Sequence, residues 1–156
     1  MSRQTGTGKA TLVGRANSKF TVVGTQASTA ETDLMAYTLP ANSLSANGKG
    51  VRITAWGGVA ANANGKTIKL YFGALVVIAA DTGVGTFNNG NWRIVAEVLR
   101  SGAATQVTTA TMNIDAASDF AIVYTSAGSE TLSGAVVIKV TWQNSVATLN
   151  DITQEG

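Results

Sequence analysis

The chain of 156 residues contains no cysteine, no histidine and only one proline. Without cysteine it can form neither a disulfide nor a thiolate metal site. Without histidine it lacks the side chain that most often serves as a general base or a metal ligand. These absences exclude the commonest hydrolase and metalloenzyme chemistries. We therefore expect no enzymatic activity, no cofactor and no metal.

Charged residues are also scarce, at 13% of the chain, against roughly 25% in an average soluble protein. Because a weakly charged surface tends to associate, we expect this surface to be covered in an assembly. The net charge of +2 is too small to indicate a nucleic-acid partner. The longest apolar run, Ala74–Ala80, is far shorter than the ~20 residues that cross a bilayer. The start of the chain has no apolar core typical of a secretion signal, so we expect neither a membrane partner nor export.

The charge that is present is unevenly distributed. Residues 1–20 contain no carboxylate and four cations, Arg3, Lys9, Arg15 and Lys19. Basic end segments are often only solvated, but a basic arm also suits an acidic partner surface. These four cations are our candidate contacts with a partner.

Short alternating segments separated by Gly, Asn and Ser turns recur along the chain, and helical patterning is weak. This spacing predicts an all-β fold, a jelly-roll-like β-sandwich of about eight strands with an extended N-terminal arm. The first strand candidates are Ala10–Gly14 and Lys19–Gly24. We expect a single domain overall, in which residues 1–32 form the arm and first strands and residues 33–156 form the sandwich.

The tetrapeptide Ala-Asn-Gly-Lys occurs twice, at residues 46–49 and 63–66. Asn-Gly is the strongest short hairpin signal, because both residues tolerate the positive φ of a type I′ turn. The pair predicts two successive hairpins that frame Val51–Val59. Within that segment, Gly57-Gly58 predicts a bulge or a bend.

The three tryptophans fall into two groups. Trp92 and Trp142 alternate in phase with Ile and Val, which predicts that both lie in the core. Trp56 is out of phase with its apolar neighbours, and exposed aromatic rings are typical of interfaces. The strand predicted at Asn91–Ser101 has a second, half-apolar face. We therefore name Trp56, Val95 and Leu99 as candidate contacts between subunits.

Other motifs carry little chemistry. Gln4–Thr11 resembles a phosphate-binding loop, but it lacks the first glycine and the Ser or Thr that follows the lysine. Gly83-Val84-Gly85 is not followed by a helical pattern, so we interpret it as a surface loop. The carboxylates are scattered, although a pair facing one cleft would suit a glycan-cleaving enzyme.

Long parts of the chain resemble a β-domain that recurs in virion proteins of tailed bacteriophages. The likeness is carried by Leu39–Gly73 with both Ala-Asn-Gly-Lys units, by the segments around Asn91–Ile94 and Val98–Gln106, and by Ile138–Thr141 and Asn150–Gly156. It covers most of the chain after Thr32. In that family such domains occur on capsid surfaces and on fibre heads, often as trimers, and the likeness transfers no catalytic residue.

The resemblance implies a structural protein of the virion, and two roles are open. In the first, a homotrimer made in the host cytoplasm binds the major capsid protein on the outer shell and stabilises it as a decoration, or cement, protein. In the second, the chain is a receptor-binding fibre tip that recognises host surface glycans through Phe87, Asn88 and Asn89. The short chain and its basic arm favour the first role.

Overall fold

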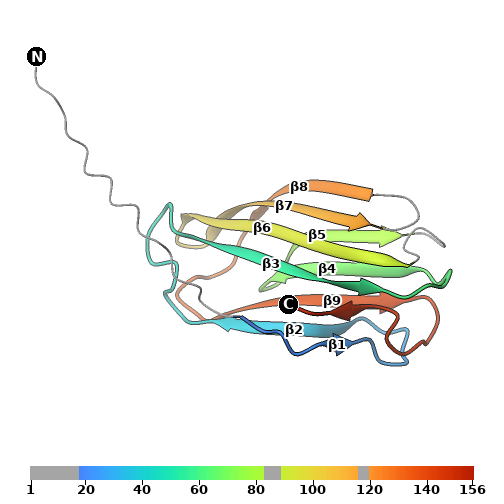
Figure 1. The fold of residues 1–156 in the computed structure, drawn as a ribbon. Helices are drawn as coiled ribbons and strands as arrows, with labels where there is room; N and C mark the ends of the chain where they lie inside the picture. The colour runs from blue at the N-terminus through green and yellow to red at the C-terminus, as the bar shows by residue number, and fades with distance from the viewer. Residues whose placement is uncertain (1–17, 83–88, 116–119) are drawn as a thin grey trace, which may run out of the picture.

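Two antiparallel four-stranded sheets pack face to face in the part of the chain that the structure, a computed structural model, describes: residues 18–82, 89–115 and 120–156 (Figure 1). Sheet I has the strand order β2 (Thr32–Leu39), β9 (Val136–Asn144), β4 (Lys66–Phe72) and β5 (Leu75–Thr82). Sheet II has the order β3 (Gly50–Val59), β6 (Gly90–Gly102), β7 (Thr105–Asp115) and β8 (Phe120–Gly128). The prediction of an all-β sandwich is confirmed.

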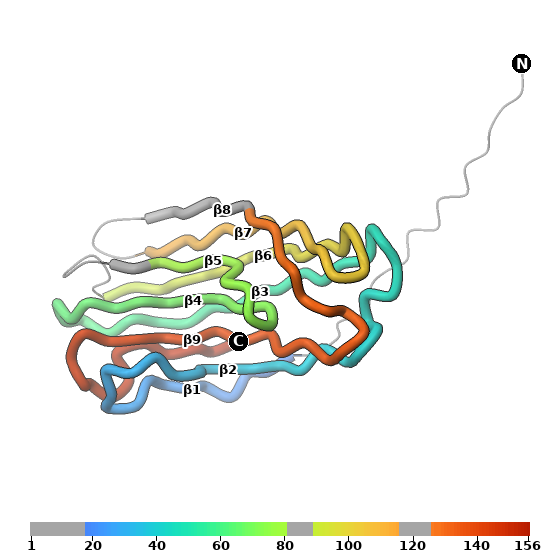
Figure 2. Tube along the Cα trace, turned by 180° about the vertical axis from the view of Figure 1, so that it is seen from behind, coloured from blue at the N-terminus to red at the C-terminus, as the bar shows by residue number. Residues whose placement is uncertain are grey.

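A third, small sheet covers part of one side of the sandwich. It pairs β1 (Val23–Gly24) with β10 (Thr153–Gln154), both of them two residues long. Figure 2 shows β1 running beside β2 on this side of the molecule. None of the residues in the described ranges forms a helix that could cross a membrane.

The core lies between the two sheets, and strand alternation places its residues there. On β6, inward residues alternate with outward ones, so that Trp92, Ile94, Ala96 and Val98 are all at most 1% exposed. From sheet I, Trp142 on β9 is also 1% exposed. The prediction that both tryptophans are core residues is confirmed. Pro40 ends β2 at Leu39, as expected for a residue that cannot donate to a ladder.

Neither Ala-Asn-Gly-Lys unit forms a hairpin, and this prediction was wrong. The first unit lies between β2 and β3 and the second between β3 and β4, so both connect strands of different sheets. At the first, Gly48 alone has a positive φ, of 82°, and its N–H donates to the Arg100 carbonyl across 2.8 Å. A type I′ turn needs positive φ at both central residues, and the second unit has it at neither.

The paired glycines of β3 do not interrupt the strand either. β3 keeps an unbroken register with β6 from Gly50 to Val59. The glycines instead allow the C-terminal segment to approach, because a Cβ at position 57 would lie 1.8 Å from the Thr153 carbonyl oxygen. Beside them, the Trp56 N–H donates to the Gly156 carbonyl and the Glu155 N–H donates to the Trp56 carbonyl, each across 2.9 Å. The predicted bulge or bend is absent from β3, and the close contact with the C-terminal segment accounts for the glycine at position 57 instead.

This contact predicts different effects for two adjacent substitutions. Gly57→Ala should push β10 away from β3 and lower the free energy of unfolding by about 1–3 kcal/mol, the usual cost of overpacking. Gly58→Ala is the matched control, because its Cβ would lie 3.3 Å from the Thr153 hydroxyl and 3.8 Å, an ordinary contact, from the Gly90 carbonyl oxygen. Urea unfolding gives the free energies, and hydrogen exchange of the Glu155 amide reports the contact directly. Equal effects of the two substitutions would contradict this packing.

Candidate functional site

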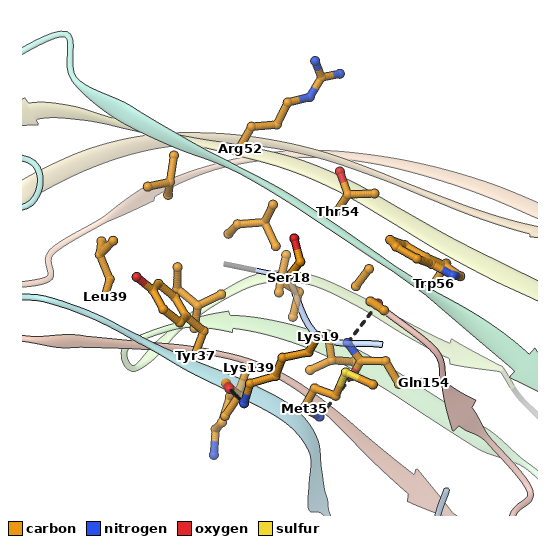
Figure 3. A pocket seen from close by; sticks show the side chains of 18 of the residues that line it. Ser18, Lys19, Met35, Tyr37, Leu39, Arg52, Thr54, Trp56, Lys139 and Gln154 are labelled. Atoms are coloured by element: carbon orange, nitrogen blue, oxygen red, sulfur yellow. Dashed lines mark hydrogen bonds between the residues drawn. The ribbon is translucent and has the colours of Figure 1, made fainter. Parts of the chain in front are cut away.

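A groove of about 580 Å³ lies between the edge strands β2 and β3, where the described part of the chain begins (Figure 3). Leu70, Ile138 and Val140 contribute to its lining from sheet I. Tyr37 and Leu39 line it from β2, and the whole of Gly50–Trp56 lines it from β3. The groove is therefore an opening in the side of the sandwich that β1 and β10 leave uncovered.

The segment that precedes β1 runs through this groove. Ser18 and Lys19 line it, and the Lys19 ammonium donates to the Ala36 carbonyl on β2. The Phe20 ring lies 6.1 Å from the Trp56 ring, centroid to centroid, at a tilt of 47°. The strand predicted at Lys19–Gly24 is thus confined to Val23–Gly24, and the residues before it attach through single contacts.

The candidate partner contacts of the arm are only partly placed. Lys19 lies at the groove, with an exposed side chain. Arg3, Lys9 and Arg15 lie outside the described residues. The chain therefore enters the sandwich between β2 and β3, directly after the most basic part of the sequence.

The three candidate subunit contacts share one sheet face. Trp56 pairs in register with Arg93, and Thr54 pairs with Val95, so these side chains point to the outer face of sheet II. Leu99 lies on the same face, 46% exposed, opposite Val107, which is 45% exposed. Sequence reasoning missed Val107, because only the pairing of β6 with β7 places it opposite Leu99. Trp56, at the sheet edge, is half-buried, and Phe20 packs against it.

Of the candidate glycan contacts, only Asn89 is described. It has a positive φ of 57°, and its N–H donates to the Ala60 carbonyl across 3.3 Å. Phe87 and Asn88 lie outside the described residues. This bond attaches the residue before β6 to the start of the connection between β3 and β4.

The outer face of sheet I carries two close ion pairs. Glu31 accepts hydrogen bonds from Lys69 (2.6 Å), Tyr71 (2.8 Å) and Thr141 (2.6 Å). Burial raises the pKa of Glu31, but these hydrogen bonds together lower it more, so its pKa lies below the usual 4.5. Lys139 donates to Asp33 across 2.8 Å, and this bond raises the pKa of Lys139. The face is a network of ion pairs that satisfy one another.

A buried polar corner holds the second Ala-Asn-Gly-Lys unit. Lys66 is fully buried and donates to the carbonyls of Asn62 and Asn64 and, across 2.8 Å, to the Asn62 side chain. Both amides donate in turn to the buried carboxylate of Asp151, Asn64 across 2.7 Å. Burial lowers the pKa of Lys66, and the charge of Asp151 raises it in part. Sequence reasoning treated this lysine as a turn residue.

Among the residues that the structure describes, no three His, Cys, Asp or Glu side chains gather as a metal ion would require. No known protein-family model matches the chain, and comparisons with curated proteins and with solved structures gave no match.

The hydrogen bonds of Glu31 predict how stability depends on pH. Because its pKa is lower in the folded state, this contribution is fully present above about pH 4.5 and is lost as the pH falls through the folded value. Glu31→Gln should therefore flatten the acid side of the stability curve, by less than about 1 kcal/mol, since the group is partly exposed and screened.

The matched control is Glu97→Gln, whose ion pair with Arg52 spans 3.9 Å and is exposed. The free energy of unfolding is measured in urea between about pH 3 and pH 7, a range that spans the usual carboxylate pKa values. The prediction is contradicted if the free energy of unfolding falls more steeply toward low pH in Glu31→Gln than in the unmodified protein.

Proposed function

We propose that this protein is a decoration, or cement, protein of a phage capsid. One observation carries the proposal beyond the sequence resemblance. The described chain begins at the side of the sandwich, where the exposed Lys19 lies directly after the other three cations of the basic segment in the sequence. The sandwich would sit on the outer shell while Arg3, Lys9 and Arg15 bind an acidic patch of the major capsid protein.

In this proposal the protein stabilises the capsid by adding contact area between its subunits. A domain that binds across neighbouring capsid subunits stabilises the assembled shell over the separated subunits by its binding free energy, because only the assembled shell offers the whole site. Expansion or rupture then has to break these contacts as well. In this proposal the protein is made in the host cytoplasm and lies on the capsid surface.

The jelly-roll-like form of the sandwich belongs to the proposal. The chain passes from one sheet to the other between β2 and β3, β3 and β4, β5 and β6, and β8 and β9. Such repeated crossing is in keeping with a double-sheet roll. The hairpin β4–β5 and the meander β6–β7–β8 keep consecutive strands together in one sheet.

Trimer formation is the second part of the proposal, and the outer face of sheet II is its basis. Leu99 and Val107 pair across β6 and β7 and expose apolar surface there, and the half-buried Val95 lies on the same face beyond Glu97. Exposed apolar patches of this kind mark interaction surfaces. We place the contact between subunits on this face.

Replacement of Leu99 by lysine tests the trimer. The unmodified protein should sediment as a trimer, and Leu99→Lys should shift it toward the monomer, because an interface core rarely tolerates an unpaired charge. Val137→Lys is the control, since Val137 is similarly exposed, at 42%, but lies on sheet I. A protein that is monomeric both in solution and on the particle would contradict the proposal.

Charge reversal tests the arm. Arg3→Glu combined with Lys9→Glu and Arg15→Glu should reduce occupancy on purified capsids by at least about tenfold, because each lost contact with an acidic surface weakens binding by roughly 1 kcal/mol. Lys49→Glu is the control, since its exposed side chain lies on the folded domain, in the connection between β2 and β3. Occupancy is read from the density on imaged particles. Full occupancy by the triple variant would show that these cations of the arm are not needed for docking on the capsid.

A further inference from the structure

The two Ala-Asn-Gly-Lys units contain the same reactive pair, Asn47-Gly48 and Asn64-Gly65. In an Asn-Gly pair the backbone nitrogen of the glycine can attack the side-chain carbonyl carbon of the asparagine, because glycine has no Cβ to hinder the approach. A C–N bond forms, ammonia leaves with the proton of the glycine N–H, and water opens the resulting cyclic imide. The product is an aspartate or an isoaspartate. Because the two tetrapeptides are identical, a large difference between their rates in the folded protein has to come from the structure around them.

The first unit is an exposed turn with a weakly held side chain. Asn47 and Gly48 are both exposed, and the Lys49 N–H closes the turn on the Ala46 carbonyl across 3.1 Å. The Asn47 side chain accepts one long hydrogen bond, of 3.3 Å, from Nε of Arg100. Within residues 18–82, 89–115 and 120–156, no group accepts a hydrogen bond from its amide nitrogen. The carbonyl carbon that would be attacked is therefore open to solvent.

The attacking nitrogen of this unit is bound, but at the end of a ladder. The Gly48 N–H donates to the Arg100 carbonyl, and the Arg100 N–H donates to the Lys49 carbonyl, each across 2.8 Å. Both bonds lie beyond the pair Gly50–Leu99, with which the pairing of β3 and β6 begins. The ends of strands open locally at a low cost in free energy. Reaction at Asn47 therefore requires only this exposed end to open.

The second unit is held through both its side chain and its backbone. The half-buried Asn64 donates to the Thr148 hydroxyl across 3.0 Å and to the buried carboxylate of Asp151 across 2.7 Å. The Gly65 N–H donates to the Ser145 hydroxyl across 2.8 Å, and the Gly65 carbonyl accepts from the Ser145 N–H across 2.9 Å. Reaction here requires the asparagine and the glycine to leave all these partners, which means that the buried corner has to open.

We propose that Asn47 deamidates spontaneously in the folded protein, and that the buried corner both protects Asn64 and rejects the product of its deamidation. A carboxylate at position 64 would replace a hydrogen-bond donor by an acceptor beside the Asp151 carboxylate, and two carboxylates that share a buried site oppose each other's ionisation. A carboxylate at position 47 would face the Arg100 guanidinium instead. The modification therefore adds a negative charge to the exposed connection between β2 and β3.

Peptide mapping of the full-length protein compares the two sites in one sample. The protein is incubated at physiological temperature and slightly alkaline pH and then cut with trypsin, which places Asn47 in Phe20–Lys49 and Asn64 in Ile53–Lys66. Tandem mass spectrometry locates the exchange of NH₂ for OH, and a sample digested before incubation gives the background. Asn47 should convert at least about tenfold faster than Asn64, because reaction at Asn64 waits for the corner to open. Conversion of Asn64 at the same rate or faster would overturn the proposal.

The same incubation in concentrated urea separates the effect of the structure from that of the sequence. The unfolded chain exposes both tetrapeptides, so their two rates should come within about threefold of each other. A difference as large as that in the folded protein would overturn the proposal, because it would then belong to the sequence around each unit.

Two aspartate substitutions test whether the corner rejects the product. Asn64→Asp should lower the equilibrium constant for folding at least about tenfold at neutral pH, because it places a second carboxylate beside Asp151 in a buried site. Asn47→Asp is the matched control and should change this constant less than about threefold, because its carboxylate is exposed and lies beside Arg100. Urea unfolding measures both. Equal losses in the two variants would overturn the proposal, since the corner would then not depend on the Asn64 amide.

Discussion

The pairing of the C-terminal segment with the edge of β3 joins the two sheets on one side of the sandwich. Gln154 accepts a hydrogen bond from the Met35 N–H of β2 across 3.1 Å, while the Thr153 carbonyl accepts one from the Trp92 indole of β6 across 3.0 Å. One short strand thus contacts sheet I and sheet II together. Because buried backbone groups must be paired, loss of this segment would leave polar groups of both sheets without partners.

The buried corner at Asp151 holds this segment in register. The Asp151 N–H donates to the Thr25 hydroxyl across 2.8 Å, and its carboxylate accepts the amides of Asn62 and Asn64. The position of β10 is therefore tied to the connection between β3 and β4. A buried carboxylate is tolerated only when it is fully hydrogen-bonded, so the corner specifies one arrangement of the C-terminal segment.

Local pattern was enough to predict much of the fold. The alternation around Trp92 and Trp142 identified inward faces, because strand periodicity is a property of neighbouring residues. The Asn-Gly units were misread because a turn's type depends on where the next strand pairs, and here that strand belongs to the other sheet. The close contact at Gly57 and the burial of Lys66 both depend on residues about ninety positions away, which no local window contains. The groove was missed for the same reason.

The two outer faces differ in what it would cost to bury them. On sheet I, Glu31 and Asp33 form ion pairs with Lys69 and Lys139, and covering charged groups requires their removal from water. On sheet II, Leu99 and Val107 expose apolar surface, and its removal from water is favourable, while the Arg52–Glu97 pair on the same face is longer, at 3.9 Å, and more exposed. The proposed interface between subunits would therefore cost less to form on sheet II. Sheet I, with its satisfied ion pairs, suits the face that stays in solvent.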